Sequence, residues 1–63
     1  MNNIDKLRKK KHLSYGDIAK EAGITPQYVS LLAKGERNNP SFDVMKAISN
    51  ALGEKMDRVF QIN

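Results

Sequence analysis

The chain has 63 residues, with 11 lysines and arginines against 7 acidic side chains and a formal net charge of +4. A chain this short buries only about 60% of its unfolded surface, so we expect one domain over residues 1–63 that depends on well-packed apolar faces. Because it has no cysteine and a single histidine, neither disulfides nor a structural zinc site can add to that stability.

The distribution of charge along the chain is uneven. Residues 1–12 hold Lys6, Arg8 and Lys9 to Lys11 against Asp5 alone, whereas basic and acidic side chains balance over residues 13–63. A basic end can follow a phosphate backbone or an anionic membrane, although charge alone favours a solvated helix face with surplus lysines. No stretch approaches the roughly 20 apolar residues of a membrane span, and no apolar run follows the N-terminal charges, so we expect a cytoplasmic protein.

The first predicted helix covers residues 3–12. Ile4, Leu7 and Lys11 recur on one face at a spacing of three and four residues. Lys11 can lay its aliphatic stem along the edge of the core while its charge stays in water. Leu13 then enters the core.

The second predicted helix covers residues 15–22. Ser14 has the character of an N-cap, and Asp17, three residues later, completes a short form of the capping box. Gly23 is expected to end the helix in a left-handed conformation. The inward face would carry Ile18, Ala19 and Ala22.

The third predicted helix begins after Thr25, its N-cap. Pro26 follows at the first helical position, where a missing N–H costs nothing. Val29 and Leu32 are expected to point inward, and Gly35 to stop the helix.

A polar loop over residues 36–40 leads to the fourth predicted helix. Ser41 caps it, Asp43 lies in its first turn, where the helix dipole favours a negative charge, and Gly53 closes it. Its expected apolar face consists of Phe42, Met45, Ile48 and Leu52, supported by Ala51.

A last short helix is expected over residues 55–60, with Met56, Val59 and Phe60 as its apolar side chains. No segment alternates at a period of two residues. The sequence therefore predicts an all-α fold of five helices around one core, without a sheet.

Residues 14–35 have the pattern of a helix-turn-helix: two short helices joined by a turn that contains a glycine. Such a pair crosses at about 90–120° and presents the second helix outward. Ala19 is small where the helices cross closely, and the wedge between them would be filled by Ile18, Ile24, Val29 and Leu32. The outer face of the third helix would then consist of Pro26, Gln27, Tyr28, Ser30, Leu31 and Lys34.

In the order and spacing of these features the sequence resembles the Cro/repressor-like, or Xre-like, helix-turn-helix proteins over nearly its whole length. The stretches that carry the resemblance are LS at 13–14, DIA at 17–19, AGI at 22–24, YVS at 28–30, Gly35, NPS at 39–41, ALG at 51–53, MD at 56–57 and VF at 59–60. The resemblance implies a compact, lambda-repressor-like domain of four or five helices that binds operator DNA, usually as a dimer.

The resemblance also implies roles for particular residues, with the third helix as the recognition helix in the major groove. The base-reading positions would be Pro26, Gln27, Ser30 and Leu31. The amide of Gln27 could pair with adenine through two hydrogen bonds, and Leu31 could touch a thymine methyl or serve a protein contact. Phosphate contacts would come from the first turns of the second and fourth helices, and from Tyr15, Lys34, Arg37, Asn38 and Asn39.

Tyr28 leaves two roles open. Its ring could stack or its hydroxyl bind phosphate, or the side chain could cover the edge of the core.

Four residues depart from the family's usual pattern. Tyr15 stands where glutamine is common, Pro26 stands at an early recognition position, and Leu31 replaces what is often a polar or basic reader. Ala33 replaces a frequent glutamate that in relatives pairs with an arginine matching Arg8, so Arg8 lacks that partner here. These changes bear on the target sequence and the affinity rather than on the fold.

We expect a sequence-specific, double-stranded DNA-binding regulator of transcription, a repressor acting as a homodimer on two half-sites about one helical turn apart. One alternative is the antitoxin of a toxin–antitoxin pair with the same fold. Another is a protein-interaction module whose helix-turn-helix no longer binds DNA, which Leu31 and Ala33 favour and Arg37 and the basic N-terminus oppose.

His12 has no nucleophile and acid arranged with it, so we expect no enzymatic activity. No motif indicates a cofactor, a metal or a small-molecule ligand. Ile62 has no place in a predicted helix and is a candidate for a dimer contact.

Overall fold

The computed structural model describes residues 2–37 and 39–60. Its helices are α1 (Ile4–Lys10), α2 (Tyr15–Ala22), α3 (Pro26–Ala33), α4 (Phe42–Leu52) and α5 (Met56–Val59). Among these residues the extended backbone pairs only at an isolated bridge between Asn2 and Phe60. The predicted all-α fold of five helices is confirmed.

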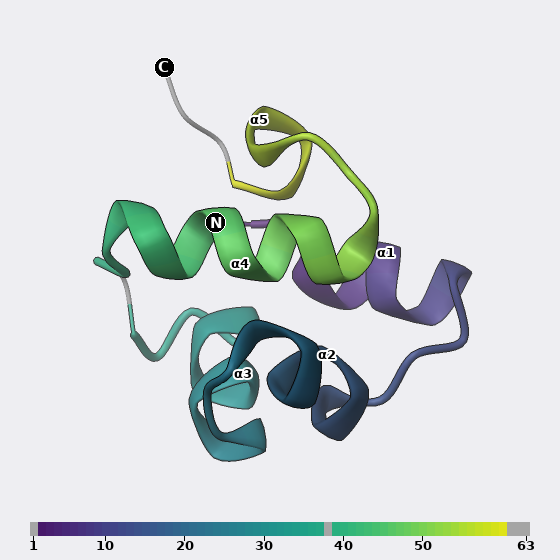
Figure 1. The fold of residues 1–63 in the computed structure, drawn as a ribbon, viewed down its shortest axis with the longest axis horizontal. Coiled ribbons are helices and arrows are strands. Elements are labelled where there is room, and N and C mark those ends of the chain that lie inside the picture. Colours follow the sequence, from purple (N-terminus) through teal and green to yellow (C-terminus); the bar gives the residue numbers. More distant parts are fainter. Residues whose placement is uncertain (1, 38, 61–63) are drawn as a thin grey trace.

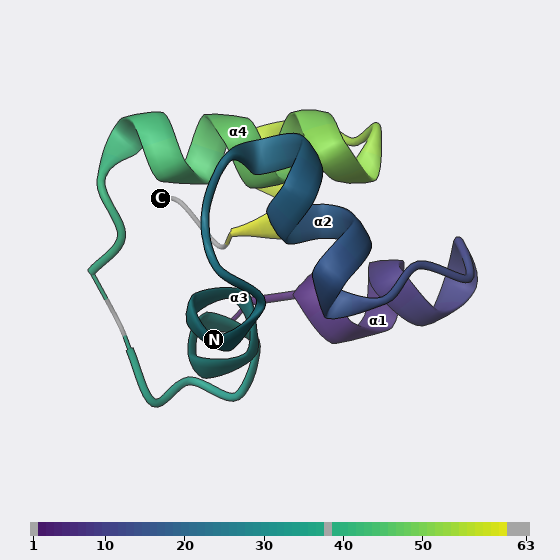
Figure 2. The same cartoon turned by 60° about the horizontal axis from the view of Figure 1, so that its bottom comes forward.

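The helices surround a core to which every one of them contributes. Figure 1 shows α4 across the middle of the molecule, with α5 on one side and α2 and α3 on the other. In Figure 2 α2 occupies the centre, and it packs against both α3 and α4. The buried apolar side chains are Ile4, Leu7, Ile18, Ala19, Val29, Leu32, Ile48, Leu52, Val59 and Phe60.

Side-chain caps begin α2, α3 and α4 as the sequence predicts. The Ser14 hydroxyl accepts the Asp17 N–H at 2.9 Å, while the Asp17 carboxylate accepts the Ser14 N–H at 2.9 Å, which completes the capping box. Thr25 accepts the Tyr28 N–H at 3.1 Å, and the Ser41 hydroxyl caps α4 in the same way. These bonds satisfy N–H groups that have no partner within the helix.

The turn between α2 and α3 depends on Gly23, whose φ is +73°. This left-handed conformation lets the N–H groups of Gly23 and Ile24 both donate to the Ala19 carbonyl, the latter at 3.0 Å. A side chain at this position would be strained, whereas glycine adopts the conformation freely. Thr25 follows at once, so α3 begins only a few residues after α2 ends.

Phe42 does not belong to the buried face of α4, contrary to the sequence-based expectation. Its side chain is 63% exposed, Met45 is partly buried, and only Ile48 and Leu52 of that set are fully buried. Phe42 is the first residue of the helix, and helical side chains lean toward the N-terminus. A side chain in the first turn therefore reaches past the end of the helix rather than over the core.

Smaller differences concern the helix ends and the core edge. His12 has a φ of +57°, so α1 ends at Lys10 instead of continuing to His12. Leu13 is partly buried and packs at the edge of the core rather than within it. The Lys11 ammonium forms an ion pair with Glu54 at 3.1 Å instead of remaining in water alone.

Two asparagines before α1 connect distant elements, which the sequence does not reveal. The Asn2 amide donates to the Leu32 carbonyl at 2.7 Å, near the end of α3. The Asn3 amide donates to the Arg58 carbonyl at 2.8 Å, and its backbone N–H donates to Val59 at 2.7 Å. The start of the chain thus ties α3 to α5.

Candidate nucleic-acid interface

The outer face of α3 is set by the burial of its inner face. Val29 is 0% and Leu32 1% exposed, so the rotation of the helix about its axis is fixed. At 100° per residue, the opposite side of α3 carries Gln27, Ser30 and Leu31, whereas Pro26, three residues before Val29, lies at the flank of the helix. Pro26 and Gln27 are exposed, and Ser30 and Leu31 are partly buried.

Tyr28 lies to one side of this outer face. It is partly buried and packs against the core, so the structure supports its role as a cover for the core edge. A phosphate contact by its hydroxyl stays a prediction.

The segment after α3 brings two cations close to the end of the helix. The Leu31 carbonyl accepts the N–H groups of Glu36 at 2.9 Å and Arg37 at 3.2 Å, which holds the turn against α3. Lys34, Arg37 and Asn39 are exposed, and neither cation pairs with a carboxylate within residues 2–37 and 39–60. Asn38, another predicted phosphate contact, lies outside the described residues.

Tyr15 is engaged with α1. Its hydroxyl donates to an Asp5 carboxylate oxygen at 2.7 Å, and the Arg8 guanidinium lies over its ring at 4.4 Å. Because the phenol proton is directed at Asp5, this hydroxyl does not offer it to a phosphate in the observed arrangement. The predicted phosphate contact of Tyr15 therefore rests on its position at the start of α2.

Arg8 gains partners in place of the glutamate that Ala33 replaces. Its Nε donates to the Asp5 oxygen at 3.0 Å, and one terminal nitrogen donates to the Leu13 carbonyl at 3.1 Å. The spacing of Asp5 and Arg8, three residues apart on a helix, is a signal that the sequence already contained. The sequence contains no such signal for the contact of Arg8 with Tyr15, because this contact joins residues of two different helices.

The hydrogen bonds in this cluster shift two pKa values. Burial opposes ionisation of Asp5, but the bonds from Tyr15 and Arg8 outweigh it, and the pKa of Asp5 lies below its ordinary value. The bond to the Asp5 carboxylate and the burial of the ring raise the pKa of Tyr15. Asp5 is therefore a carboxylate and Tyr15 a neutral phenol at neutral pH.

Within the described part of the chain, no three potential metal-ligating side chains lie together. None of its helices is long and apolar enough to cross a membrane.

Comparison with known proteins identifies the architecture. A family model described as helix-turn-helix matches residues 4–59, which span the chain from the start of α1 to the end of α5. The chain belongs to the Cro/repressor-like, or Xre-like, helix-turn-helix family. None of the curated protein sequences compared with this chain matches it.

Membership of this family identifies α2 and α3 as the two helices of the helix-turn-helix. The family consists of DNA-binding regulators of transcription, so its members bind double-stranded DNA. In a helix-turn-helix the second helix enters the major groove while the first crosses the backbone. Here these helices are α3, whose outer face carries Gln27, and α2, whose first residue, Tyr15, lies against Arg8.

Proposed function

We propose that the protein binds particular sequences of duplex DNA through the outer face of α3 and represses transcription as a homodimer. The observation that carries the proposal is the division of α3 into two faces. Val29 and Leu32 are fully buried, and the opposite face carries Gln27 in its exposed first turn. A helix anchored in this way can enter a groove without rearrangement of the core.

Binding would combine two kinds of contact. Gln27 reads a base edge, and Pro26, Ser30 and Leu31 add polar and apolar contacts beside it. Lys34 and Arg37, together with Asn39 and the first turn of α2, approach phosphate and fix the register of the helix.

The size of the molecule fits a dimer on two successive turns of DNA. Its longest extent is 27 Å between Cα positions, whereas half-sites one turn apart are separated by roughly 34–36 Å. Two copies can thus lie side by side with room for a contact between them. Pairing would supply affinity that one small domain lacks, and occupancy of the operator would exclude the polymerase. Ile62, the candidate dimer contact, lies outside the described residues.

The remaining parts of the proposal follow from this role. The protein acts in the cytoplasm, residues 1–63 serve as one DNA-binding unit, and no catalytic step is involved. A protein-interaction module is the second candidate function. It is favoured by the 63% exposure of Phe42 and by Leu31 on the outer face of α3. The antitoxin of a toxin–antitoxin pair with the same fold is a separate alternative.

Selection from a pool of random duplexes tests the proposal. The protein should enrich a common sequence. Its affinity for DNA should fall as the salt concentration rises, because binding releases cations from the DNA phosphates and this release is less favourable at high salt. If no sequence is enriched and duplex binding is absent at low salt, the protein-interaction function takes first place.

The salt dependence can be assigned to one residue. Arg37→Ala should weaken binding to every duplex alike and reduce the slope of log K against log salt by about one unit. Lys55→Ala is the matched control, because Lys55 precedes α5, which lies across α4 from α3 (Figure 1). An unchanged slope in Arg37→Ala would mean that this side chain does not face phosphate.

A further inference from the structure

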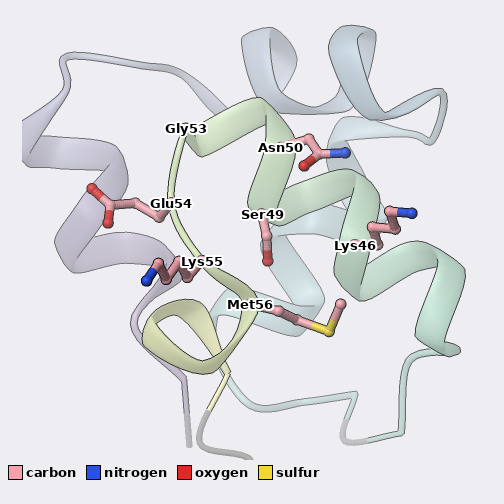
Figure 3. A pocket seen from close by; sticks show the side chains of 7 residues that line it. All are labelled: Lys46, Ser49, Asn50, Gly53, Glu54, Lys55 and Met56. Atoms are coloured by element: carbon pink, nitrogen blue, oxygen red, sulfur yellow. The ribbon is translucent and has the colours of Figure 1, made fainter.

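Among the helices of residues 2–37 and 39–60, α3 alone carries no charged side chain. Its sequence, PQYVSLLA, has neither an acid nor a base, whereas α1, α2, α4 and α5 each hold both signs. Figure 3 shows, for example, Lys46 on α4 and Glu54 and Lys55 in the turn that leads to α5. Within the helix itself, the outer face of α3 therefore offers only neutral polar and apolar groups.

The lack of charge on α3 limits which bases this face can read. In the major groove guanine presents two acceptors, N7 and O6, whose commonest partners are arginine and lysine, while glutamate and aspartate accept from the amino group of cytosine. None of these four residue types occurs in α3. Lys34 follows only at the C-terminal cap, whereas the N-terminal residues of a recognition helix contact the base edges. A G·C pair would therefore find no charged partner along the helix.

The amide of Gln27 is complementary to adenine. Its NH2 group can donate to adenine N7 while its oxygen accepts from the adenine amino group. Against guanine the same oxygen would face O6, another acceptor, with no proton between them. Gln27 is exposed in the first turn of α3, so this amide is accessible to a base edge.

Leu31 lies one turn further along the outer face and is apolar. It is partly buried, yet it is not one of the side chains that pack against the core of the described residues. Its carbonyl accepts the N–H groups of Glu36 and Arg37, so the following turn holds the backbone at this position. An apolar side chain fixed on the outer face is suited to the methyl group that thymine presents in the major groove.

We infer that α3 reads A·T base pairs, an adenine through Gln27 and a thymine methyl through Leu31. Residues four apart on a helix have Cβ atoms about 5–6 Å apart, and successive bases on one strand are separated by about 3.4 Å, so the two bases lie within about two base pairs of each other. This assignment rests on the proposed function, because α3 must first lie in the groove.

The test replaces single groups in the duplex enriched by selection without changing its base pairing. Uracil in place of thymine removes the methyl, and 7-deazaadenine in place of adenine removes N7. One uracil position in each half-site should weaken binding of the full chain about fourfold, the effect of one methyl group left unburied. One 7-deazaadenine position, within about two base pairs of it, should weaken binding roughly threefold to tenfold, the effect of one lost hydrogen bond.

Two variants assign these positions to side chains. Leu31→Ala should bind the thymine duplex no better than wild type binds the uracil duplex, and uracil should cost it nothing more. Gln27→Ala should likewise be insensitive to 7-deazaadenine. Phe42→Ala, which removes an exposed apolar side chain outside α3, is the matched control and should keep both sensitivities.

Three results would overturn the inference, and they separate it from the proposed function. If Leu31→Ala weakens binding equally on the thymine and uracil duplexes, Leu31 serves a protein contact instead of the methyl. If neither substitution matters at any position of the enriched duplex, α3 does not read A·T pairs, although sequence-specific binding stands. If selection enriches no duplex, the proposed function fails and the inference fails with it.

Discussion

Single residues of α3 only two positions apart have opposite surroundings. Val29 is fully buried in the core, whereas Gln27 is exposed in the first turn. The helical period alone predicts this difference, because residues that share the inner face recur every three or four positions. Which side chains meet across the interior requires the structure.

Val29→Asp tests the inner face. The substitution places an unpaired carboxylate in the core, which costs several kcal/mol against a total stability of roughly 5 kcal/mol. We expect the helical circular-dichroism signal to be lost at 25 °C. Gln27→Asp is the matched control, with the same new side chain on the outer face, and it should keep the signal. A Val29→Asp protein that melts like wild type would mean that the rotation of α3 is wrong.

The residue-level contacts that the sequence could not predict join segments far apart. The Asn2 amide reaches a carbonyl 30 residues away, and the Tyr15 hydroxyl meets an acid 10 residues earlier. Nothing in the local spacing of these residues indicates the contact, because it depends on how α1, α2 and α3 are placed. The loss of a glutamate at Ala33 was visible, but the new partners of Arg8 at Leu13 and Tyr15 were not.

At the scale of helices, the starts of α2, α3 and α4 are the best predicted features. Ser14, Thr25 and Ser41 each begin a helix with a side-chain cap, because the hydrogen bond is made within three residues. The apolar face of α4 was predicted less well. Phe42 has the right spacing from Met45, but spacing does not show where the core ends.

Ser14→Ala tests the start of α2. Loss of the cap should cost about 1 kcal/mol, since the Asp17 N–H loses its acceptor. For a domain of this size that corresponds to a fall of roughly 4–8 °C in the melting temperature. Glu21→Ala, at an exposed position of the same helix, should change it little. Equal melting of Ser14→Ala and wild type would show that the capping box does not stabilise the domain.

At the scale of the whole molecule, charged contacts join elements that are distant in the sequence and lie close together because they pack around one core. Glu54, in the turn between α4 and α5, pairs with Lys11 beyond α1, and Asp5 joins α1 to α2. The family and the fold class were predictable, because they follow from caps, glycines and apolar spacing along the chain. The ion pair of Glu54 with Lys11 was not, since it joins segments far apart in the sequence.

Acid should weaken the folded state through three carboxylates. The pKa of Glu54 is lowered, first by its hydrogen bond from Lys11, that of Asp17 by its bonds to Ser14, and that of Asp5 as described above. A carboxylate whose pKa is lower in the folded than in the unfolded state stabilises the fold at pH values above its unfolded-state pKa. This stabilisation is lost as the pH falls through its folded-state pKa.

The melting temperature should therefore be steady from neutral pH to about pH 5. It should fall once the pH drops below the ordinary pKa values, 4.5 for glutamate and 3.8 for aspartate. Glu54→Gln should melt lower than wild type at pH 7, and this difference should shrink toward pH 3. Thermal denaturation across this range measures both. A difference that stays constant with pH would mean that Glu54 does not stabilise the fold through its charge.

The central claim, that the outer face of α3 reads DNA sequence, is tested most directly by Gln27→Ala. The variant and wild type are titrated at one fixed salt concentration with the duplex enriched by selection and with a scrambled duplex of the same composition. The account predicts a loss of about 1–3 kcal/mol on the enriched duplex and little change on the scrambled one, with the fold intact because Gln27 is exposed. Equal losses on both duplexes would show that Gln27 positions the protein without reading a base. No loss on either would contradict the assignment of α3 as the reading helix.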